Sequence, residues 1–377
     1  MSDSEGLFED KITAQDLRFM AAAIRYSRRN LGLTSTNPSV GTLIVKDNGF
    51  GPVIIGRGVT ALGGRPHAER EALREAGENA RGATAYVTLE PCAHHGKTPP
   101  CAEALISAGI ARVVAAANDP DDRVSGKGYA MLRAAGIEVQ ENVLGKMAAN
   151  QLAGYLVRSF KKRPEVIVKL ALSFDGFIGV DGQGQVPITG SVARSQSHLM
   201  RAETDAILIG IATALEDDPE LTCRLDGMAH RSPIRIVLDS ALRLPLSSKL
   251  VQSAARVPLW IACGVDVPLE KRIQYQNAGC HIIATDTSEG VIALPELLND
   301  LGELGVATLL VEGGASIAAS FLREGLVDRL ALFQAPVKIG AGGIPVQGLQ
   351  HYIETEFTLL RSADFGADHY AEYVRKC

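Results

Sequence analysis

The sequences PHAE at residues 66–69 and EPCAHHGKTPPC at residues 90–101 place one imidazole, two thiols and one uncommitted carboxylate in a small part of this chain. Zn²⁺ binds histidine nitrogen and cysteine sulfur readily, and a catalytic zinc site uses three protein ligands so that water can occupy the fourth position. We therefore predict that His67, Cys92 and Cys101 bind zinc. Glu69 follows His67 by two residues, and we expect it to carry protons beside the metal without binding it.

An H-x-E motif followed by P-C-x-x-C is the signature of zinc-dependent nucleobase deaminases. In this chain eight residues separate the two cysteines. One alternative is a structural zinc site, closed by His94 or His95 as a fourth ligand. A second alternative is that His67 is an ordinary histidine and the cysteines are small buried apolar residues.

The residues around the motif predict how its side chains are held. Residues 67–77 are typical of a short helix ending at a glycine, and residues 83–89 of a strand that runs into Pro91. A second helix is expected from Cys101, just after two prolines. Two of the predicted ligands thus lie at helix N-termini, where the dipole and free backbone N–H groups favour a thiolate.

The whole chain has the composition of an ordinary soluble protein, and its charge favours a small-molecule substrate. It has 377 residues, of which 46% are hydrophobic and 21% charged, with a net charge of −5. No broad basic surface is expected, so a nucleic-acid partner is disfavoured. No secretory signal and no membrane span of about 18 apolar residues is recognisable. We predict a cytoplasmic protein without a membrane or nucleic-acid partner.

The pattern of elements predicts two α/β domains of different fold. A helix near 13–31, with a possible capping box at Thr13, precedes strands near 40–46, 52–57 and 112–117 and helices at 126–135 and 145–160. Lysine, arginine and proline at 161–164 interrupt this pattern. We expect domains at 1–148 and 165–377, joined by residues 149–164. In the second domain strands are expected at 166–173, 206–210, 234–239, 258–262, 281–284, 307–311 and 328–334.

The second domain carries weaker chemical signals. Residues 309–318 (LLVEGGASIA) predict a strand, a Gly-Gly turn and a helix start, an arrangement that allows backbone N–H groups to approach a phosphate. A Gly-Gly turn is more often purely structural. No G-x-G-x-x-G follows a strand, so a Rossmann dinucleotide site has no direct support.

With both halves considered, the sequence resembles the bifunctional deaminase–reductase family of riboflavin biosynthesis over nearly its full length. The resemblance rests on NPSVG at 37–41, PHAE at 66–69, ATAYVTLEPC at 83–92, HHGKTPPC at 94–101, KLALSFDG at 169–176, DDP at 217–219, IRIVLDS at 234–240 and VEGG at 311–314. It implies a cytidine-deaminase-like three-layer α/β/α domain followed by a dihydrofolate-reductase-like α/β domain that uses NADPH. It also implies a homodimer or homotetramer.

The resemblance implies two reactions. The first is hydrolytic removal of the 2-amino group of 2,5-diamino-6-ribosylamino-4(3H)-pyrimidinone 5′-phosphate, with Asn37 and Lys97 contacting the substrate. The second is NADPH-dependent reduction of the ribosyl group to ribityl, with Lys169 and Asp217 as catalytic residues. The expected cofactor contacts are Leu172, Pro187, Thr213, Asp217, Ser240, Gly313 and Gly314. The expected substrate contacts are Gln185, Arg201, Leu221, Arg224 and Glu312.

Two positions depart from the family pattern. Thr60 stands where a histidine is usual, which alters one expected substrate contact, and Pro187 stands in place of an aromatic wall for the cofactor. Three hypotheses therefore compete. They are a two-reaction enzyme, a zinc deaminase whose second domain is inactive, and a nucleic-acid-editing or structural zinc module that the acidic charge disfavours.

Overall fold

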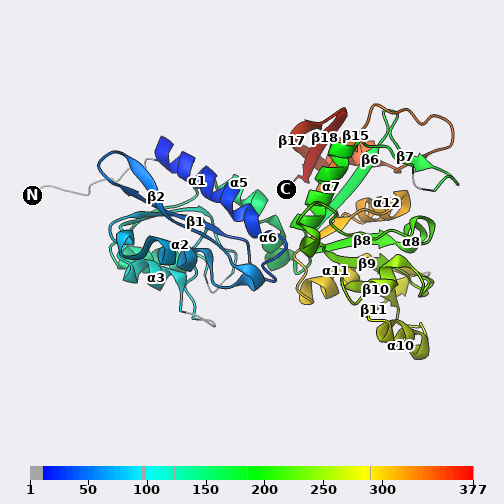
Figure 1. The fold of residues 1–377 in the computed structure, drawn as a ribbon, viewed down its shortest axis with the longest axis horizontal. Coiled ribbons are helices and arrows are strands. Elements are labelled where there is room, and N and C mark those ends of the chain that lie inside the picture. The colour runs from blue at the N-terminus through cyan, green and yellow to red at the C-terminus, as the bar shows by residue number, and fades with distance from the viewer. Residues whose placement is uncertain (1–11, 96–98, 122–123, 185, 289, 377) are drawn as a thin grey trace, which may run out of the picture. The chain divides into compact units, whose positions relative to one another are not determined.

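The computed structural model describes residues 12–376 except 96–98, 122–123, 185 and 289. The chain forms two compact units, Met1–Phe160 and Lys161–Cys377, called here the N-terminal and C-terminal units (Figure 1). No described helix is both long and apolar enough to cross a bilayer.

The N-terminal unit is a three-layer α/β/α sandwich. Its sheet has the order β2-β1-β3-β4-β5, in which β1 is antiparallel to both neighbours and β3, β4 and β5 are parallel. Helices α1 and α5 cover one face, and α2, α3 and α4 lie on the other (Figure 1). The elements are α1 (Ala14–Ser27), β1 (Gly41–Asp47), β2 (Pro52–Val59), α2 (Ala68–Ala76), β3 (Thr84–Leu89), α3 (Cys101–Ser107), β4 (Arg112–Ala117), α4 (Lys127–Ala134), β5 (Glu138–Gln140), α5 (Gly145–Gln151) and α6 (Ala153–Lys161).

Local sequence signals fix the start of α1. Thr13 and Asp16 form the predicted capping box, in which the Asp16 backbone N–H donates to the Thr13 hydroxyl at 3.1 Å and the Thr13 N–H donates to the Asp16 carboxylate at 3.0 Å. Arg112 on β4 then pairs with buried Asp16 at 2.6 Å. Burial would raise the pKa of Asp16, but the hydrogen bonds from Arg112 and Thr13 outweigh it and lower the pKa to about 2. The helix is thereby locked to the sheet.

The C-terminal unit is built on a nine-stranded sheet of order β11-β10-β9-β8-β14-β6-β15-β18-β17. Strands β11 to β15 in this order are parallel, and β18 and β17 are antiparallel. The principal strands are β6 (Glu165–Leu172), β8 (Ala206–Gly210), β9 (Ile234–Leu238), β10 (Leu259–Gly264), β11 (His281–Thr285), β14 (Thr308–Val311), β15 (Arg329–Gln334), β17 (Phe357–Phe365) and β18 (Asp368–Arg375).

Helices follow most of these strands. They are α7 (Ser191–Glu203), α8 (Ile211–Asp217), α9 (Lys249–Gln252), α10 (Leu269–Asn277), α11 (Leu294–Glu303), α12 (Ala315–Arg323) and α13 (Leu349–Glu356). Short strands form two small ribbons, β7 (Phe177–Val180) with β16 (Gly343–Pro345) and β12 (Thr287–Ser288) with β13 (Val291–Ile292).

The large sheet is buried on both faces because its apolar side chains alternate between two cores. On β8, Ala206 and Leu208 pack with α11 and α12, whereas Ile207 and Ile209 pack with α8, α9 and α10. This is the two-residue period of a strand covered on both sides. In such sheets ligands bind beyond the carboxyl ends of the parallel strands. The turns after β6, β8, β9 and β14 meet that condition.

The structure corrects two features of the predicted element pattern. The single helix expected at 145–160 is two helices, α5 and α6, because Leu152 leaves the helical conformation (φ −97°, ψ 10°) and is buried in the core. The C-terminal hairpin of β17 and β18 was not predicted. Its outer strand, β17, is exposed at most positions. Polar and apolar residues do not alternate regularly along it.

Candidate active sites

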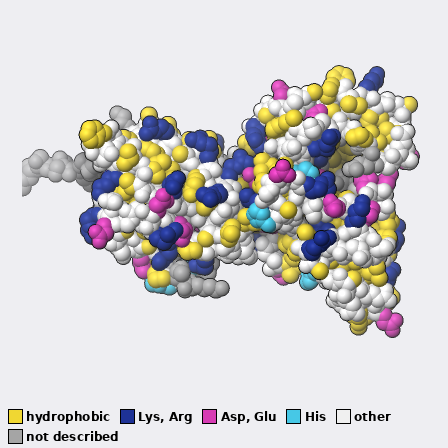
Figure 2. Space-filling model, in the orientation of Figure 1, with side chains coloured by type: hydrophobic (Ala, Val, Ile, Leu, Met, Phe, Trp, Pro, Cys, Tyr) yellow, Lys and Arg dark blue, Asp and Glu magenta, His cyan; other side chains and the backbone are white. Residues whose placement is uncertain are grey.

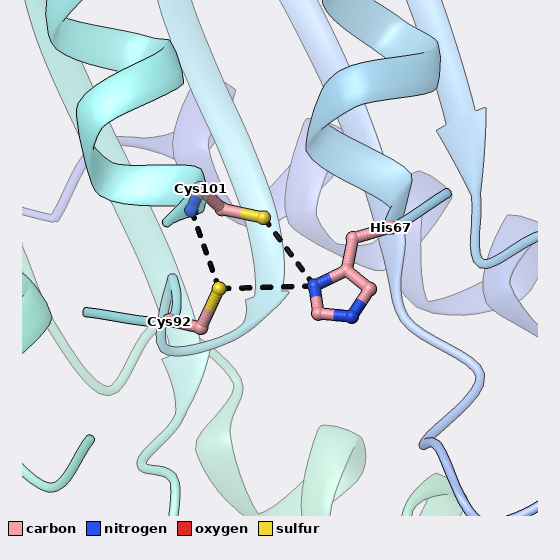
Figure 3. Close-up of side chains that lie close together, drawn as sticks. All are labelled: His67, Cys92 and Cys101. Carbon is pink, nitrogen blue, oxygen red and sulfur yellow. Dashed lines mark hydrogen bonds between the residues drawn. The ribbon is translucent and has the colours of Figure 1, made fainter. Parts of the chain in front are cut away.

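Three elements of the N-terminal unit bring the predicted zinc ligands together (Figure 3). His67 is the N-cap of α2, Cys92 follows β3, and Cys101 is the first residue of α3. Both sulfur atoms point toward His67 Nδ1, which lies 3.7 Å from the sulfur of Cys92 and 3.4 Å from that of Cys101. The predicted position of ligands at two helix N-termini is therefore observed.

The geometry of this group fits a zinc ion. Tetrahedral bonds of about 2.3 Å to sulfur and about 2.1 Å to nitrogen separate the two atoms by about 3.6 Å, and the observed distances of 3.4 and 3.7 Å bracket this value. Among the described residues only His67, Cys92 and Cys101 form a metal-ligand group, with their ligand atoms within 4.8 Å of one another. Neither candidate for a fourth ligand, His94 or His95, belongs to this group, and His95 is exposed and pairs with Glu103 at 3.0 Å. Three protein ligands favour a catalytic site over a structural one.

The two thiols are not equivalent. The pKa of Cys92 is lowered to about 4, chiefly because the Cys101 thiol donates to it, with further contributions from His67 and from the Cys101 backbone N–H at 3.2 Å. The pKa of Cys101 is raised by the same thiol contact and by burial. Cys92 is therefore the sulfur that is most ready to bind a cation as a thiolate.

Glu69 lies on the first turn of α2 beside this group and is 4% exposed. Burial raises the pKa of Glu69 to about 7; the charge of Cys92 acts in the same direction and that of His67 opposes it. A carboxyl group whose pKa is near neutrality can both accept and return a proton. This is the property that the predicted proton carrier requires.

The loop that precedes β1 carries Asn37 close to the segment that leads into His67. A Cβ atom on Gly64 would lie 2.4 Å from Asn37 Nδ2, so glycine is needed for this segment to approach Asn37. Thr60 is buried, and its hydroxyl accepts from the Val40 N–H at 2.9 Å and donates to the Pro38 carbonyl at 2.8 Å. Thr60 thus supports the backbone that presents Asn37. Lys97 lies outside the described residues.

Two buried carboxyl groups had no predicted role and lie near His67, Cys92 and Cys101, called here the zinc-ligand group. Glu90 accepts hydrogen bonds from the Gly126 and Gly128 backbone N–H groups, both at 3.1 Å. Asp119 accepts from the Tyr155 hydroxyl at 2.9 Å, and its charge interacts with that of Cys92. Burial raises the pKa of both carboxyl groups. Glu90 stands directly before Pro91 and Cys92 in the motif, which is the one sequence signal that pointed to it.

In the C-terminal unit Glu312, at the end of β14, is surrounded by cations. Arg201 on α7 donates to both carboxylate oxygens, from Nε at 2.8 Å and from Nη2 at 2.9 Å, and Lys169 Nζ on β6 lies at 3.8 Å. Burial would raise the pKa of Glu312, but the charges of Arg201 and Lys169 outweigh it and lower the pKa to about 2. Three residues predicted from different parts of the sequence therefore form one charged cluster.

Residues 221–224 border this cluster. Leu221 is buried with a positive φ of 56°, and the side chain of Arg224 is exposed and lies 3.3 Å from Glu220. His198 Nδ1 accepts from the Arg224 backbone N–H at 3.3 Å. His198 was not predicted, although its position three residues before Arg201 on α7 places both on one helix face. Gln185 lies outside the described residues.

The Gly-Gly turn has the close packing expected of a phosphate-binding turn. A Cβ on Gly313 would lie 2.9 Å from the Ile317 side chain, and one on Gly314 would lie 3.3 Å from the Thr213 hydroxyl. Gly314 is the N-cap of α12, so free backbone N–H groups and the Thr213 hydroxyl are adjacent.

Three of the other predicted cofactor contacts lie at or beyond the carboxyl ends of β6, β8 and β9. Leu172 ends β6, Ser240 follows β9, and half-buried Asp217 ends α8, where burial raises its pKa. Pro187 is exposed. On the face shown in Figure 2, lysine and arginine side chains are interspersed with aspartate and glutamate over both units.

Family models match both units. Residues 13–117 match the cytidine and deoxycytidylate deaminase zinc-binding region, and residues 164–370 match the RibD C-terminal domain. These matches confirm the fold class expected for each half. They also support Zn²⁺ and NADPH as the cofactors.

Curated relatives and solved structures are similar to this chain over most of its length. The riboflavin biosynthesis protein RibD of Escherichia coli K12 is 38% identical over 87% of this chain and 89% of its own length, and that of Actinobacillus pleuropneumoniae is 37% identical over 96% of both. The structure of Acinetobacter baumannii RibD has a TM-score of 0.82 at 34% identity, covering 96% of this chain and 99% of that one. The Thermotoga maritima diaminohydroxyphosphoribosylaminopyrimidine deaminase/5-amino-6-(5-phosphoribosylamino)uracil reductase has a TM-score of 0.82 at 31% identity, with the same coverage. The chain belongs to the RibD family, the bifunctional deaminase/reductases of riboflavin biosynthesis.

Proposed function

We propose that the N-terminal unit deaminates 2,5-diamino-6-ribosylamino-4(3H)-pyrimidinone 5′-phosphate at His67, Cys92, Cys101 and Glu69, and that the C-terminal unit reduces the product at the Lys169–Arg201–Glu312 cluster. The observation that carries this proposal is the zinc-ligand group, with ligand distances suited to Zn²⁺ and a buried carboxyl group of pKa about 7 beside it. The Thermotoga maritima relative is named for a deaminase and a reductase acting on the same class of compounds, which supports this choice of substrates.

In the deamination, water adds to C2 of the pyrimidinone, the bond from C2 to the amino nitrogen breaks, and ammonia leaves. When bound, Zn²⁺ makes water acidic enough to be a nucleophile near neutral pH. Glu69 accepts the proton that the water loses and returns it to the departing amine. Asn37 and Lys97 orient the ring, and the loop anchored by Thr60 keeps Asn37 in place.

In the reduction, C1′ of the ribosyl group gains hydride, its bond to the ring oxygen breaks, and that oxygen gains a proton to give the ribityl chain. NADPH supplies the hydride when bound. Lys169 lies at the reacting end of the cluster, Glu312 accepts hydrogen bonds from sugar hydroxyls, and Arg201 and Arg224 attract the 5′-phosphate. Leu221 and Gln185 complete the substrate contacts.

The cofactor contacts are part of the same proposal. The turn at Gly313 and Gly314 offers backbone N–H groups to the cofactor phosphates, with Thr213 beside it. The rest of the cofactor is contacted by Leu172, Pro187, Asp217 and Ser240. Asp217 also takes part in catalysis. The intact cluster of Lys169, Arg201 and Glu312 favours an active second unit over an inactive one.

Three further expectations belong to this proposal. The catalytic domains extend over 1–148 and 165–377, joined by residues 149–164. The protein is cytoplasmic, which is consistent with five described cysteines that form no disulfide. It assembles as a homodimer or homotetramer, which sedimentation velocity measures directly.

Removal of zinc tests the first half of the proposal. We expect the rate of ammonia release to fall at least about 100-fold in chelator-treated protein, because the metal is absent. The same fall is expected in a Cys92→Ala variant, because one of the three ligands is absent. NADPH oxidation with the already deaminated substrate should remain, since its site lies in the other unit. Cys280→Ala, which removes a buried thiol of the C-terminal unit, is the matched control and should retain zinc. Full ammonia release from protein shown by metal analysis to be zinc-free would overturn the proposed role.

A further inference from the structure

His198 connects α7 to residues 222–224 by contacts to their backbone. Its Nδ1 accepts from the Arg224 N–H at 3.3 Å, and its ring is also hydrogen-bonded to the Thr222 backbone. One turn later on the same helix, Arg201 Nη1 donates to the Thr222 carbonyl at 3.1 Å. Two side chains of α7 thus hold one short segment.

The held segment needs such support because it has no regular secondary structure. It follows Leu221, whose backbone is left-handed with φ 56°, and the Cys223 N–H donates to the Ser232 hydroxyl at 3.1 Å. The Arg224 side chain is 56% exposed, and its ion pair with Glu220 lies at the surface. Surface ion pairs contribute little to stability. The position of the Arg224 backbone is therefore set by the backbone contacts of this segment and not by the ion pair with Glu220.

We infer that His198 is a positioning residue for the reductase substrate: it holds the backbone of residues 222–224 so that Arg224 and Arg201 face the same phosphate. This inference rests on the proposed function, which assigns both arginines to the substrate. His198 touches neither the substrate nor the reacting atoms. It acts by holding in place the backbone from which the Arg224 side chain extends, which reduces the ordering that binding requires.

The chemistry of the ring suits this role. An imidazole accepts a hydrogen bond only at an unprotonated nitrogen, so the contact with Arg224 requires neutral His198. Burial lowers the pKa of His198, and the charges of Arg201 and Arg224 lower it further, while the hydrogen bond to the Thr222 backbone and the charge of Glu312 oppose them. The charges of Arg201 and Arg224 therefore favour the neutral form of His198, in which Nδ1 can accept the hydrogen bond from the Arg224 N–H.

Kinetics of His198→Leu and His198→Asn test the inference. Leucine removes the acceptor, whereas the asparagine oxygen can take the place of Nδ1. We expect His198→Leu to raise the reductase KM about 10-fold, which corresponds to one lost hydrogen bond, with kcat within about 2-fold of wild type. His198→Asn should recover most of this loss. Ser195→Ala, an exposed hydroxyl on the same helix, is the matched control, and ammonia release should be unchanged in all three variants.

A second readout does not depend on activity. Nitrogen NMR of labelled histidine, with the His198 signals assigned by their loss in His198→Asn, should show an unprotonated Nδ1. A protonated Nδ1, a KM within about 2-fold of wild type in His198→Leu, or a fall in kcat alone would each overturn the positioning role. Failure of the proposed function looks different: Arg224→Gln would then leave the reductase KM unchanged while the NMR signal still showed the acceptor.

Discussion

Replacement of Glu69 by glutamine will reduce ammonia release about 1000-fold and leave NADPH oxidation with the deaminated substrate intact. The reason is that Glu69 is the buried carboxyl group beside the zinc-ligand group, with a pKa raised to about 7 by burial. Glutamine keeps its size but cannot accept and return a proton, and general acid–base catalysis contributes about 100-fold to 10,000-fold. Zinc content should not change, because Glu69 is not a ligand.

The matched control for this prediction is Glu71→Gln. Glu71 lies two residues later on α2 and pairs with Arg74 at 2.9 Å, away from the zinc-ligand group. Its loss should change the rate of ammonia release by less than about 2-fold, since surface ion pairs contribute little. Ammonia release within about 10-fold of wild type in Glu69→Gln, with zinc bound, would contradict the role assigned to Glu69.

Glu312→Gln has the second large effect, on the reductase. The substitution leaves Arg201 and Lys169, whose side chains are only 13% and 15% exposed, without their common carboxylate. Removal of one partner from a buried ion pair costs about 3–5 kcal/mol, so we expect a clear loss of thermal stability in the C-terminal unit. Reductase kcat/KM should fall at least about 100-fold, because the cations that meet the substrate lose their arrangement. Calorimetry and NADPH oxidation measure the two effects.

The stability difference has a defined pH dependence. The pKa of Glu312 is about 2, below its usual value, since Arg201 and Lys169 outweigh the effect of burial. Its contribution to stability is therefore complete above the unfolded pKa of about 4.3 and is lost as the pH falls through about 2. The free energies of unfolding of wild type and Glu312→Gln should show their full difference at pH 7. This difference should disappear between about pH 4 and 2.

Glu324→Gln is the matched control for Glu312→Gln, because Glu324 is an exposed carboxylate at the end of α12. It should leave both stability and reduction within experimental error of wild type. If Glu312→Gln behaved like this control, the charged cluster would not be the reductase site.

The sequence predicted the zinc-ligand group well because each part has a local signal. The helix that begins after His67, the strand that ends before Cys92 and the helix that starts at Cys101 are all visible as short-range patterns. Close approach then follows because the two helices pack side by side on one face of the sheet that contains the strand. Buried Asp16 and its partner Arg112 were harder to predict, because the two residues are 96 positions apart.

The C-terminal site was predicted as separate residues, and the sequence could not show how they pair. Arg201 and Glu312 were both expected to contact substrate, but the structure places them in contact with each other. His198 escaped prediction because a single histidine on a helix has no motif, and its partner is a backbone N–H group that no side-chain pattern reveals. Such long-range contacts depend on sheet order, which local patterns do not encode.

The ratio of ammonia released to NADPH oxidised by the zinc-loaded wild-type protein tests the central claim most directly. The substrate is the diaminopyrimidinone ribosyl phosphate, and both products are followed in the same reaction. We predict one NADPH oxidised for each ammonia released, with ammonia appearing first. Ammonia without NADPH oxidation would contradict an active second unit, and the absence of both signals would contradict the two-reaction account.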